Sequence, residues 1–253
     1  MRTLKTHLIE AKYEFLKLFR LPAYVIPTLA FPMMFYMLFG VGLGRQRISA
    51  SVTMAKYLLA TYGTFGVIAA ALFGFGVSVA GERGQGWLEL KRTTPMPITA
   101  YFFAKMVMSM IFSAIIVVGL LLLGAVAGAG VPLTQALPLM GVLLLGSITF
   151  CAMGLAVGYF AGPNSAAAIV NVIYLPMSFL SGLWIPIFVL PRAIQKLAVV
   201  LPPFHFSQIA LNTIGAGRGG SMLPHVIAMI VFTILFLAVA YAGYRRDEGK
   251  MYG

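Results

Sequence analysis

Long apolar runs dominate this chain, and six of them are long enough to cross a lipid bilayer as helices. A transmembrane helix needs about 20 predominantly apolar residues. The six predicted spans cover residues 23–43, 52–80, 101–128, 137–161, 166–185 and 223–244. The pattern therefore predicts an all-α, polytopic integral membrane protein in which residues 1–253 form a single transmembrane domain.

The first 21 residues follow a different pattern, with an apolar stripe at helical spacing. The stripe consists of Leu4, Leu8, Ala11, Phe15 and Leu18. Charged residues occupy its flanks and far side: Lys5, Lys12, Glu14 and Lys17. A segment this polar does not span a membrane, so we expect residues 1–21 to form an amphipathic helix in the membrane interface. A plain basic anchor beside the first span is the alternative.

Residues 81–97, which read GERGQGWLELKRTTPMP, are the one long polar interruption between apolar runs. They carry five charges: Glu82, Arg83, Glu89, Lys91 and Arg92. One charge at the centre of a membrane-spanning helix costs about 2.5–3.5 kcal/mol, so five would cost on the order of 10 kcal/mol or more. This stretch therefore lies outside the membrane, as a loop between the second and third spans.

Residues 186–222, between the fifth and sixth spans, are largely apolar but broken by proline and glycine. Residues 191–201 predict a short helix with Pro191 at its first position, and Pro202 and Pro203 break it. Residues 205–215 predict a second short helix that stops at a glycine. Apolar helices of this length are typical of re-entrant or interfacial segments, so we expect short re-entrant helices on the outer side.

Lysine and arginine are unequally distributed between the two sides of the predicted bundle. An even number of spans places both termini on one side, together with residues 81–97. That side carries 12 of the 18 lysines and arginines, and the other side carries 6. Loops rich in lysine and arginine stay on the cytoplasmic side of the membrane. Both termini and residues 81–97 are therefore expected to be cytoplasmic, in a multi-pass protein of the inner (cytoplasmic) membrane.

The composition excludes a soluble protein. The chain is 60% hydrophobic and 9% charged, whereas soluble domains carry about 25% charged residues. The net charge of +12 is explained by the loops of a membrane protein, so we expect the lipid bilayer rather than nucleic acid as a partner. The single cysteine, Cys151, excludes an internal disulfide.

The sequence carries no pattern typical of an enzyme, of a nucleotide-hydrolysing motor or of an ion-coupled transporter. A G-x-x-x-x-G-K-[ST] phosphate loop is absent, and GAGRGG at residues 215–220 follows no strand and opens no helix. His7, His205 and His225 are expected to lie far apart, so no metal site is expected. No cofactor and no catalytic residue are expected in this chain. None of the six Asp and Glu residues falls in a span, which disfavours proton or sodium coupling, although backbone carbonyls can also coordinate sodium.

Residues 81–105 (GERGQGWLELKRTTPMPITAYFFAK) resemble the loop between the second and third spans of ABC-2-type permeases, the membrane subunits of a class of bacterial ABC exporters. The matching positions are Glu82, Arg83, Gly86, Leu88, Glu89, Thr94, Pro95 and Lys105. Trp87 and Lys91 depart from the usual residues. Residues 181–212 also resemble the outer re-entrant region of that family.

The resemblance implies a complex of two permease subunits with two cytoplasmic ATPase subunits, which bind ATP and Mg. The second permease is expected to be a copy of this chain, with a sibling permease as the alternative. The polar loop would form a coupling helix at Trp87–Arg92 that docks on the ATPase. The residues implied in coupling are Glu82, Arg83, Gly86, Trp87, Leu88, Glu89, Leu90, Thr94 and Pro95. Trp87, Leu88 and Leu90 would supply an apolar knob, and Glu82 and Glu89 would pair with basic residues of the ATPase.

The resemblance favours the drug- and lipid-export branch, so we expect a permease for a lipophilic drug-like or lipid substrate. An exporter of lipid-linked polysaccharide, an ion-gradient-driven secondary transporter and a membrane scaffold for an ATPase are alternatives. Five residues are candidates for the substrate path: Phe31, Phe35, Tyr62, Phe65 and Asn171. Lipid-facing aromatics and a helix–helix hydrogen bond from Asn171 are the simpler interpretations. The spacing of Gly154, Gly158 and Gly162 indicates close helix packing, within one subunit or between two.

Overall fold

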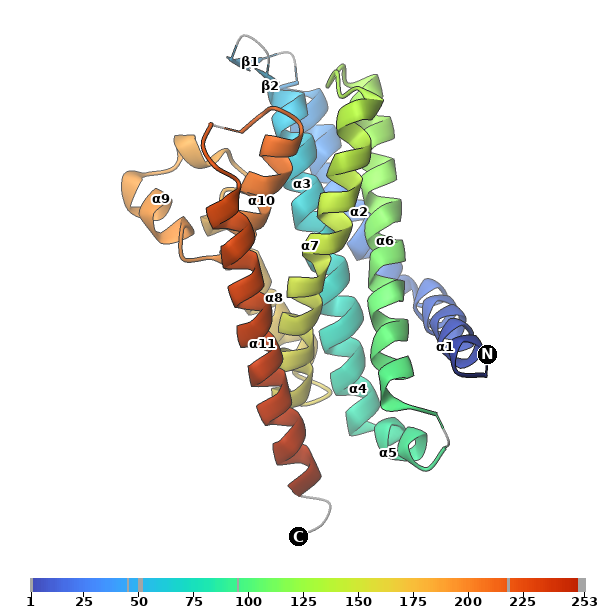
Figure 1. Ribbon diagram of the computed structural model, residues 1–253. Helices are drawn as coiled ribbons and strands as arrows, with labels where there is room; N and C mark the ends of the chain where they lie inside the picture. Colours follow the sequence, from blue (N-terminus) through green and yellow to red (C-terminus); the bar gives the residue numbers. More distant parts are fainter. Residues whose placement is uncertain (1, 45, 50–51, 95, 218, 250–253) are drawn as a thin grey trace.

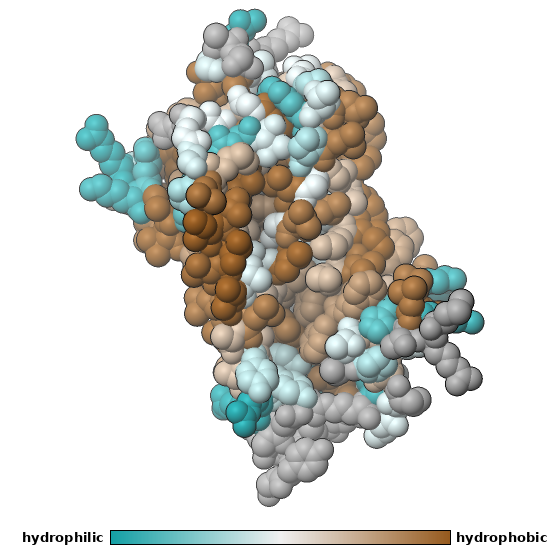
Figure 2. All heavy atoms as spheres, viewed as in Figure 1, coloured by the Kyte–Doolittle hydropathy of each residue, from teal (hydrophilic) through white to brown (hydrophobic). Residues whose placement is uncertain are grey.

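The computed structural model describes residues 2–44, 46–49, 52–94, 96–217 and 219–249 as a bundle of long helices, with a two-stranded hairpin at one end (Figure 1). Five of the helices in these residues are long and apolar enough to cross a membrane. Their bounds are Pro22–Val41, Met54–Gly84, Thr99–Val126, Leu133–Phe160 and Leu223–Asp247. Apolar side chains cover the middle of the visible face, and hydrophilic ones gather toward its ends and over one outlying helix (Figure 2). The prediction of an all-α, multi-pass membrane protein is confirmed.

The first two long helices each contain a π-helical segment. Helix α2 (Pro22–Phe35) continues into η1 (Tyr36–Val41), and a hairpin of β1 (Arg47–Ser49) and β2 (Val52–Thr53) follows. Helix α3 (Met54–Ala71), η2 (Leu72–Val77) and α4 (Ser78–Gly84) then form one continuous rod. The polar stretch expected from residue 81 thus begins as an extension of the second span, because its first residues complete the helix.

Three further long helices match the third, fourth and sixth predicted spans. Helix α6 covers Ile98–Val126, α7 covers Leu133–Phe160, and α11 covers Leu223–Gly249. The rod of α3, η2 and α4 is central to the bundle, with 83% of its most apolar window buried, whereas the corresponding value for α11 is 17%. Helix α11 packs mainly against α7 and presents the rest of its apolar surface outward, as a lipid-facing helix does.

The fifth predicted span is shorter than expected. Residues 166–185 were predicted to be helical, but α8 covers only Ala166–Leu180, or 15 residues. At 1.5 Å per residue this is roughly 22 Å, against a hydrocarbon thickness of about 30 Å. Gly182 ends the helix with a φ of 76°, and the Leu183 amide bonds back to the Ser178 carbonyl at 3.1 Å. Such a left-handed glycine turns the chain out of a helix.

The region between α8 and α11 contains the two short helices that the sequence predicts. After the turn η3 (Ile187–Val189), α9 covers Arg192–Ala198 and α10 covers Pro202–Thr213. The prediction that Pro202 and Pro203 only end the first helix was incomplete, because these prolines form the first turn of α10. Proline is favourable there, since the first amides of a helix have no intrahelical partner.

Glycine allows α7 to lie in backbone contact with the central rod. A Cβ added at Gly154 would lie 3.1 Å from the Gly76 nitrogen, and one at Gly158 would lie 2.9 Å from the Gly76 carbonyl oxygen. Gly162 lies beyond this contact, in the turn before α8. Of the two interpretations of the glycine spacing, packing within one subunit therefore accounts for Gly154 and Gly158.

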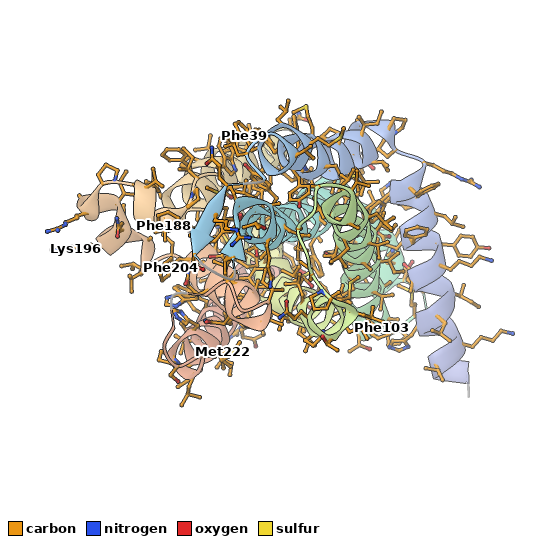
Figure 3. All side chains as sticks on the ribbon, turned by 90° about the horizontal axis from the view of Figure 1, so that it is seen from above. Phe39, Phe103, Phe188, Lys196, Phe204 and Met222 are labelled. Atoms are coloured by element: carbon orange, nitrogen blue, oxygen red, sulfur yellow. The ribbon has the colours of Figure 1, made fainter. Side chains whose placement is uncertain are left out.

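The N-terminal helix α1 (Arg2–Phe19) lies across the side of the bundle rather than along it, as the view from above shows (Figure 3). Its buried face carries Ala11, Glu14 and Leu18, and it packs on α6. Leu4 and Leu8, at the start of the predicted stripe, are exposed. Glu14 was placed on the flank or far side by the sequence pattern, but it is buried against the bundle. Glu14 can be buried there because it accepts a hydrogen bond from the Lys105 ammonium.

Candidate functional site

The short helix that the sequence predicts at residues 87–92 is present with the expected bounds. Helix α5 covers Trp87–Arg92, and it follows a turn at Gln85 and Gly86. Gly86 has a φ of 74°, a conformation that side-chain-bearing residues rarely adopt. After α5, the Thr94 hydroxyl donates to the Lys91 carbonyl at 2.7 Å and helps to end the helix.

Two apolar side chains are exposed among those of α5 that the structure describes. Trp87 is 50% exposed and Leu90 is 57% exposed, whereas Leu88 is 4% exposed and packs into the core. An apolar knob on this helix thus consists of Trp87 and Leu90, without Leu88. The side chain of Glu89 and the whole of Pro95, both predicted coupling residues, lie outside the part of the chain that the structure describes.

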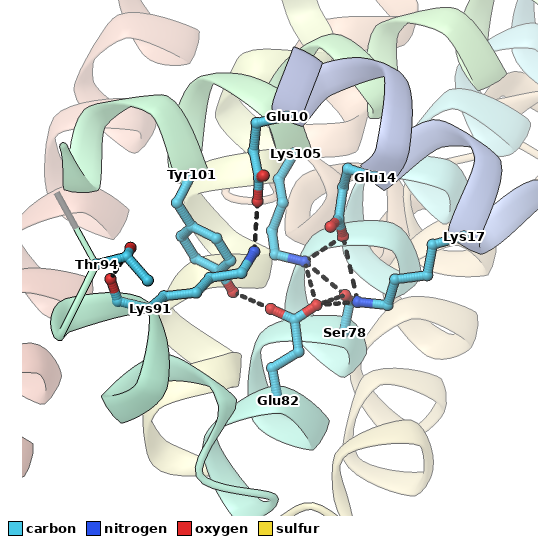
Figure 4. Close-up of polar contacts among 9 residues, drawn as sticks. All are labelled: Glu10, Glu14, Lys17, Ser78, Glu82, Lys91, Thr94, Tyr101 and Lys105. Carbon is cyan, nitrogen blue, oxygen red and sulfur yellow. Dashed lines mark hydrogen bonds and ion pairs between the residues drawn. The ribbon is translucent and has the colours of Figure 1, made fainter. Parts of the chain in front are cut away.

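Glu82 is held inside the molecule by donors from α1 and α6 and by Ser78 of its own helix, α4 (Figure 4). Lys105 Nζ lies 3.1 Å from Glu82 Oε1, and the Tyr101 hydroxyl donates to Glu82 Oε2 at 2.6 Å. Lys17 on α1 donates to the same carboxylate. The expectation that Glu82 pairs with a partner ATPase therefore conflicts with its position, since its carboxylate already has four donors in this chain.

Lys105 has no exposed surface, and its ammonium is satisfied entirely by neighbouring oxygens. Besides Glu82, it donates to Glu14 Oε1 at 2.5 Å and to Ser78 Oγ at 2.6 Å. A buried ammonium without such acceptors would cost several kcal/mol of desolvation. The same pairing explains why Glu14 can be buried on α1.

A further ion pair ties α5 itself to α1. Lys91 Nζ lies 2.5 Å from Glu10 Oε1 and 4.6 Å from the centre of the Tyr101 ring. We refer to the whole set as the charged cluster. It consists of Glu10, Glu14, Lys17, Ser78, Glu82, Lys91, Tyr101 and Lys105. Its three carboxylates and three ammoniums balance, and they connect α1 with α4, α5 and α6.

Lys17 is the most accessible charge of the cluster, with a side chain that is 50% exposed. Partial burial lowers the pKa of Lys17, but the nearby Glu14 and Glu82 carboxylates outweigh this effect, and the pKa is raised above its ordinary value. Lys17 is therefore cationic throughout the physiological pH range.

Arg83 points to the opposite side of α4 and caps the end of α7. Its guanidinium donates to the Gly158 carbonyl at 2.8 Å, to the Ala161 carbonyl at 3.2 Å and to the Tyr159 carbonyl. A cation at the C-terminal end of a helix satisfies its last carbonyls and the negative end of its dipole. Arg83 Nε also lies 3.7 Å from Asp247 Oδ1, near the end of α11. Arg83 is thus engaged within the chain rather than displayed to a partner.

A groove of about 1480 Å³ rises from the charged cluster between α1, α2, α3 and α8. Phe31, Phe35, Phe65 and Asn171, four of the five predicted path residues, line it. Tyr62 does not line it, because its ring is fully buried and its hydroxyl donates to the Trp184 carbonyl. Asn171 bonds to Ala167 in its own helix at 3.1 Å, so the amide contact that the structure records is not between helices.

Sequence reasoning missed most of the charged cluster. Glu10, Glu14, Lys17 and Tyr101 were not identified as site residues. Lys105 matched the family pattern, and its position inside an apolar run was a usable signal. The partners of Lys105 come from residues 14, 78 and 82, and only the folded chain brings these together.

His205 and His225 lie together, although the sequence analysis placed the histidines far apart. Their Nδ1 atoms are 2.9 Å apart, and His205 Nε2 lies 2.8 Å from the Val199 carbonyl oxygen. Across the described residues there is no group of three or more potential metal ligands. The pair links α10 to α11 at the end of the molecule opposite α5.

Comparison with known proteins places the chain in a family. The model of ABC-2 family transporter proteins matches residues 45–242. The chain is 27% identical over 238 residues to the "Putative transport permease YvfS" of Bacillus subtilis (strain 168), covering 93% of this chain and 95% of that protein. It is also 27% identical over 185 residues to the "Inner membrane transport permease YhhJ" of Escherichia coli (strain K12), covering 70% of this chain and 48% of the longer protein. The helical bundle and the extent of these matches together show that this chain belongs to the ABC-2 family of transporter proteins, as a permease of the ABC-2 type.

Proposed function

We propose that this chain is the permease subunit of an ATP-binding cassette exporter, driven by two separate cytoplasmic ATPase subunits that bind ATP and Mg. The observation that carries the proposal is α5, which presents Trp87 and Leu90 outward at the polar end of the bundle. Large exposed apolar side chains on a polar surface are typical anchors of protein–protein interfaces. The relatives named as transport permeases support the same function.

The ion pairs around α5 suit a helix that transmits force. A force on Trp87 or Leu90 would reach α1 through the Lys91–Glu10 pair, and α6 through the contact of Lys91 with Tyr101. The charged cluster would carry the movement onward, because Glu82 lies on the continuous rod of α3, η2 and α4. Six crossings and cytoplasmic termini are part of the proposal.

The contact of Arg83 with Asp247 supports six crossings. The two residues lie at one end of the bundle, so the chain between them crosses an even number of times. Helices α6, α7 and α11 account for three crossings. A fourth crossing must then lie within residues 161–222, and the polypeptide of α8 with the turn after it is the segment available.

The groove supports a lipophilic substrate, drug-like or lipid, that enters from the cytoplasm or the inner leaflet. The functional unit would contain a second permease subunit, proposed to be another copy of this chain. Lipid-linked polysaccharide as cargo, and transport driven by an ion gradient without an ATPase, are the competing functions.

Reconstitution tests the proposal directly. The permease would be co-purified with its partner ATPase and placed in liposomes, and export of fluorescent lipids and drugs would be followed. We expect transport to require ATP and to stop with a hydrolysis-deficient ATPase. Transport by the permease alone under an ion gradient, or movement only of a labelled glycan, would overturn the proposal.

A further inference from the structure

The two ends of the groove differ sharply in chemistry. At the α8 end the wall is aromatic: the Trp184 ring stacks on Phe35 with centres 5.6 Å apart and meets Phe65 edge-on at 5.7 Å. At the α1 end the lining residues belong to the charged cluster, with Trp87 beside them. An occupant that matches both ends must itself be amphiphilic.

The most exposed charge that an occupant would meet at the floor is cationic. The Glu14 and Glu82 side chains are 4% and 8% exposed and already accept bonds from lysines. Lys17 is 50% exposed, and Lys91 is 24% exposed. Glu10, the partner of Lys91, is 21% exposed. Glu14 and Glu82 thus lie behind the ammoniums, and Lys17 is the dominant accessible charge at the floor.

We propose that the groove binds an anionic phospholipid, with its head group at Lys17 and Lys91 and an acyl chain along Phe35, Phe65 and Trp184. This inference rests on the proposed function, because it names the lipid class taken by the same groove. A phosphate accepts charge-assisted hydrogen bonds from both ammoniums. The volume of about 1480 Å³ exceeds the range of about 300–1,000 Å³ that is typical of sites for drug-sized ligands, and it suits a lipid better.

The protonation state of Lys17 supports an anionic head group. Lys17 is outside the membrane-spanning helices, and its raised pKa keeps it cationic. The titratable groups that face it are Glu14 and Glu82, both held by Lys105 as well. The positive charge of Lys17 should therefore change little between about pH 6 and about pH 9.

The chain contains two tryptophans, Trp87 and Trp184, and both line the groove at opposite ends. This permits a binding test that needs neither ATP nor transport. The full chain would be purified as Trp87→Phe, leaving Trp184, and as Trp184→Phe, leaving Trp87, in nanodiscs of zwitterionic lipid. Each would be titrated with phosphatidic acid or phosphatidylcholine carrying bromine in the acyl chain, and tryptophan quenching would be recorded.

We expect saturable quenching of Trp184 by brominated phosphatidic acid, with an apparent Kd about tenfold below that for phosphatidylcholine. Trp87 should be quenched much less by the same lipid, because it marks the head-group end. Lys17→Gln with Lys91→Gln should raise the apparent Kd for phosphatidic acid about tenfold, whereas the matched Lys17→Arg with Lys91→Arg should preserve it. A thermal unfolding curve for each variant shows that the fold is kept.

Equal quenching by the two lipids would overturn the proposal, as would stronger quenching of Trp87 than of Trp184. Absence of quenching at both tryptophans would also overturn it, because it would show that no lipid enters the groove. The outcome is separate from the test of the proposed function. Binding with no ATP-dependent transport contradicts the exporter, and transport with no preference for the anionic lipid contradicts only this inference.

Discussion

A single fully buried ammonium organises the polar end of this protein. Lys105 has no exposed surface, and it holds Glu14 from α1 and Glu82 from α4 at once. Removal of one partner of a buried ion pair leaves the other charges uncompensated, which costs more than the pair itself contributes. Lys105 therefore fixes the position of α1 against the bundle by charge as well as by apolar contact.

We expect Lys105→Met to lower the free energy of unfolding by about 3–5 kcal/mol, because Glu14 and Glu82 would lose their buried partner and keep only the half-exposed Lys17. Thermal unfolding in detergent would measure the change. Lys196→Met on the exposed part of α9 is the matched control, and its effect should stay within about 0.5 kcal/mol. Equal losses in the two variants would show that Lys105 has no special role in stability.

Gly154 is one of the two glycines at which α7 closely approaches the backbone of the central rod. A Cβ at Gly154 would lie 3.1 Å from the Gly76 nitrogen and 3.2 Å from the Ala71 carbonyl oxygen, whereas a Cβ at Gly141, also on α7, meets no atom within 4 Å. We expect Gly154→Val to destabilise the protein by about 1–3 kcal/mol through overpacking, and Gly141→Val to cost less than that. Thermal unfolding of both variants provides the comparison. A larger loss for Gly141→Val would contradict the packing described here.

At the scale of elements, α5 has one face built into the molecule and one face free. Leu88 packs inward, while Trp87 and Leu90 point outward. The inward face holds the helix in a fixed position, and the exposed apolar side chains on the outward face offer a surface to which a partner could bind. The helix has only six residues, so packing and ion pairs rather than intrinsic helix stability must hold it in shape.

We expect Trp87→Ala with Leu90→Ser to abolish stimulation of the partner ATPase while leaving insertion and unfolding temperature nearly unchanged. The reason is that both side chains are largely exposed in this chain and would be buried only by the partner. Leu197→Ser, at a similarly exposed position on α9, should leave ATPase activity unaltered. Full ATPase stimulation in the double variant would show that the knob is not the docking surface.

At the scale of the whole molecule, the contacts of α1 and α11 set the topology. Glu14 joins Lys105 and Arg83 joins Asp247, so both terminal helices contact the end of the bundle that carries α5. Helix α9 lies toward the opposite end, to one side of the bundle, and Lys196 points away from it (Figures 1 and 3). The proposal of six crossings therefore assigns α5 and α9 to opposite sides of the membrane.

Cysteine labelling tests this topology. In a Cys151→Ser background, Lys196→Cys should react with a membrane-impermeant maleimide added to intact cells, whereas Thr94→Cys should react only after the membrane is opened. Both positions are exposed in the structure, so failure to react reports the side of the membrane and not burial. Labelling of Thr94→Cys from outside would reverse the proposed orientation.

Apolar run length predicted the long helices well, because insertion in a bilayer depends mainly on local composition. The bounds of α5 were also predicted, since glycines precede this helix and prolines follow it in the sequence. The length of the apolar run overestimated α8, because Gly182 turns the chain out of the helix within that run. Pairings such as Lys105 with Glu14, or His205 with His225, join residues far apart in the sequence, and composition carries no information about them.

The π-helical segment η2 sets the direction in which Glu82 faces. A π-turn holds one residue more than an α-turn, so everything after it is rotated by about 100° relative to an uninterrupted α-helix. In family members of different length, insertion or deletion at this one point would therefore act as a rotation of the cytoplasmic end rather than as a change of length. Deletion of Gly74 should turn Glu82 away from Lys105 and lower the unfolding temperature as Lys105→Met does, and an unchanged unfolding temperature would contradict this account.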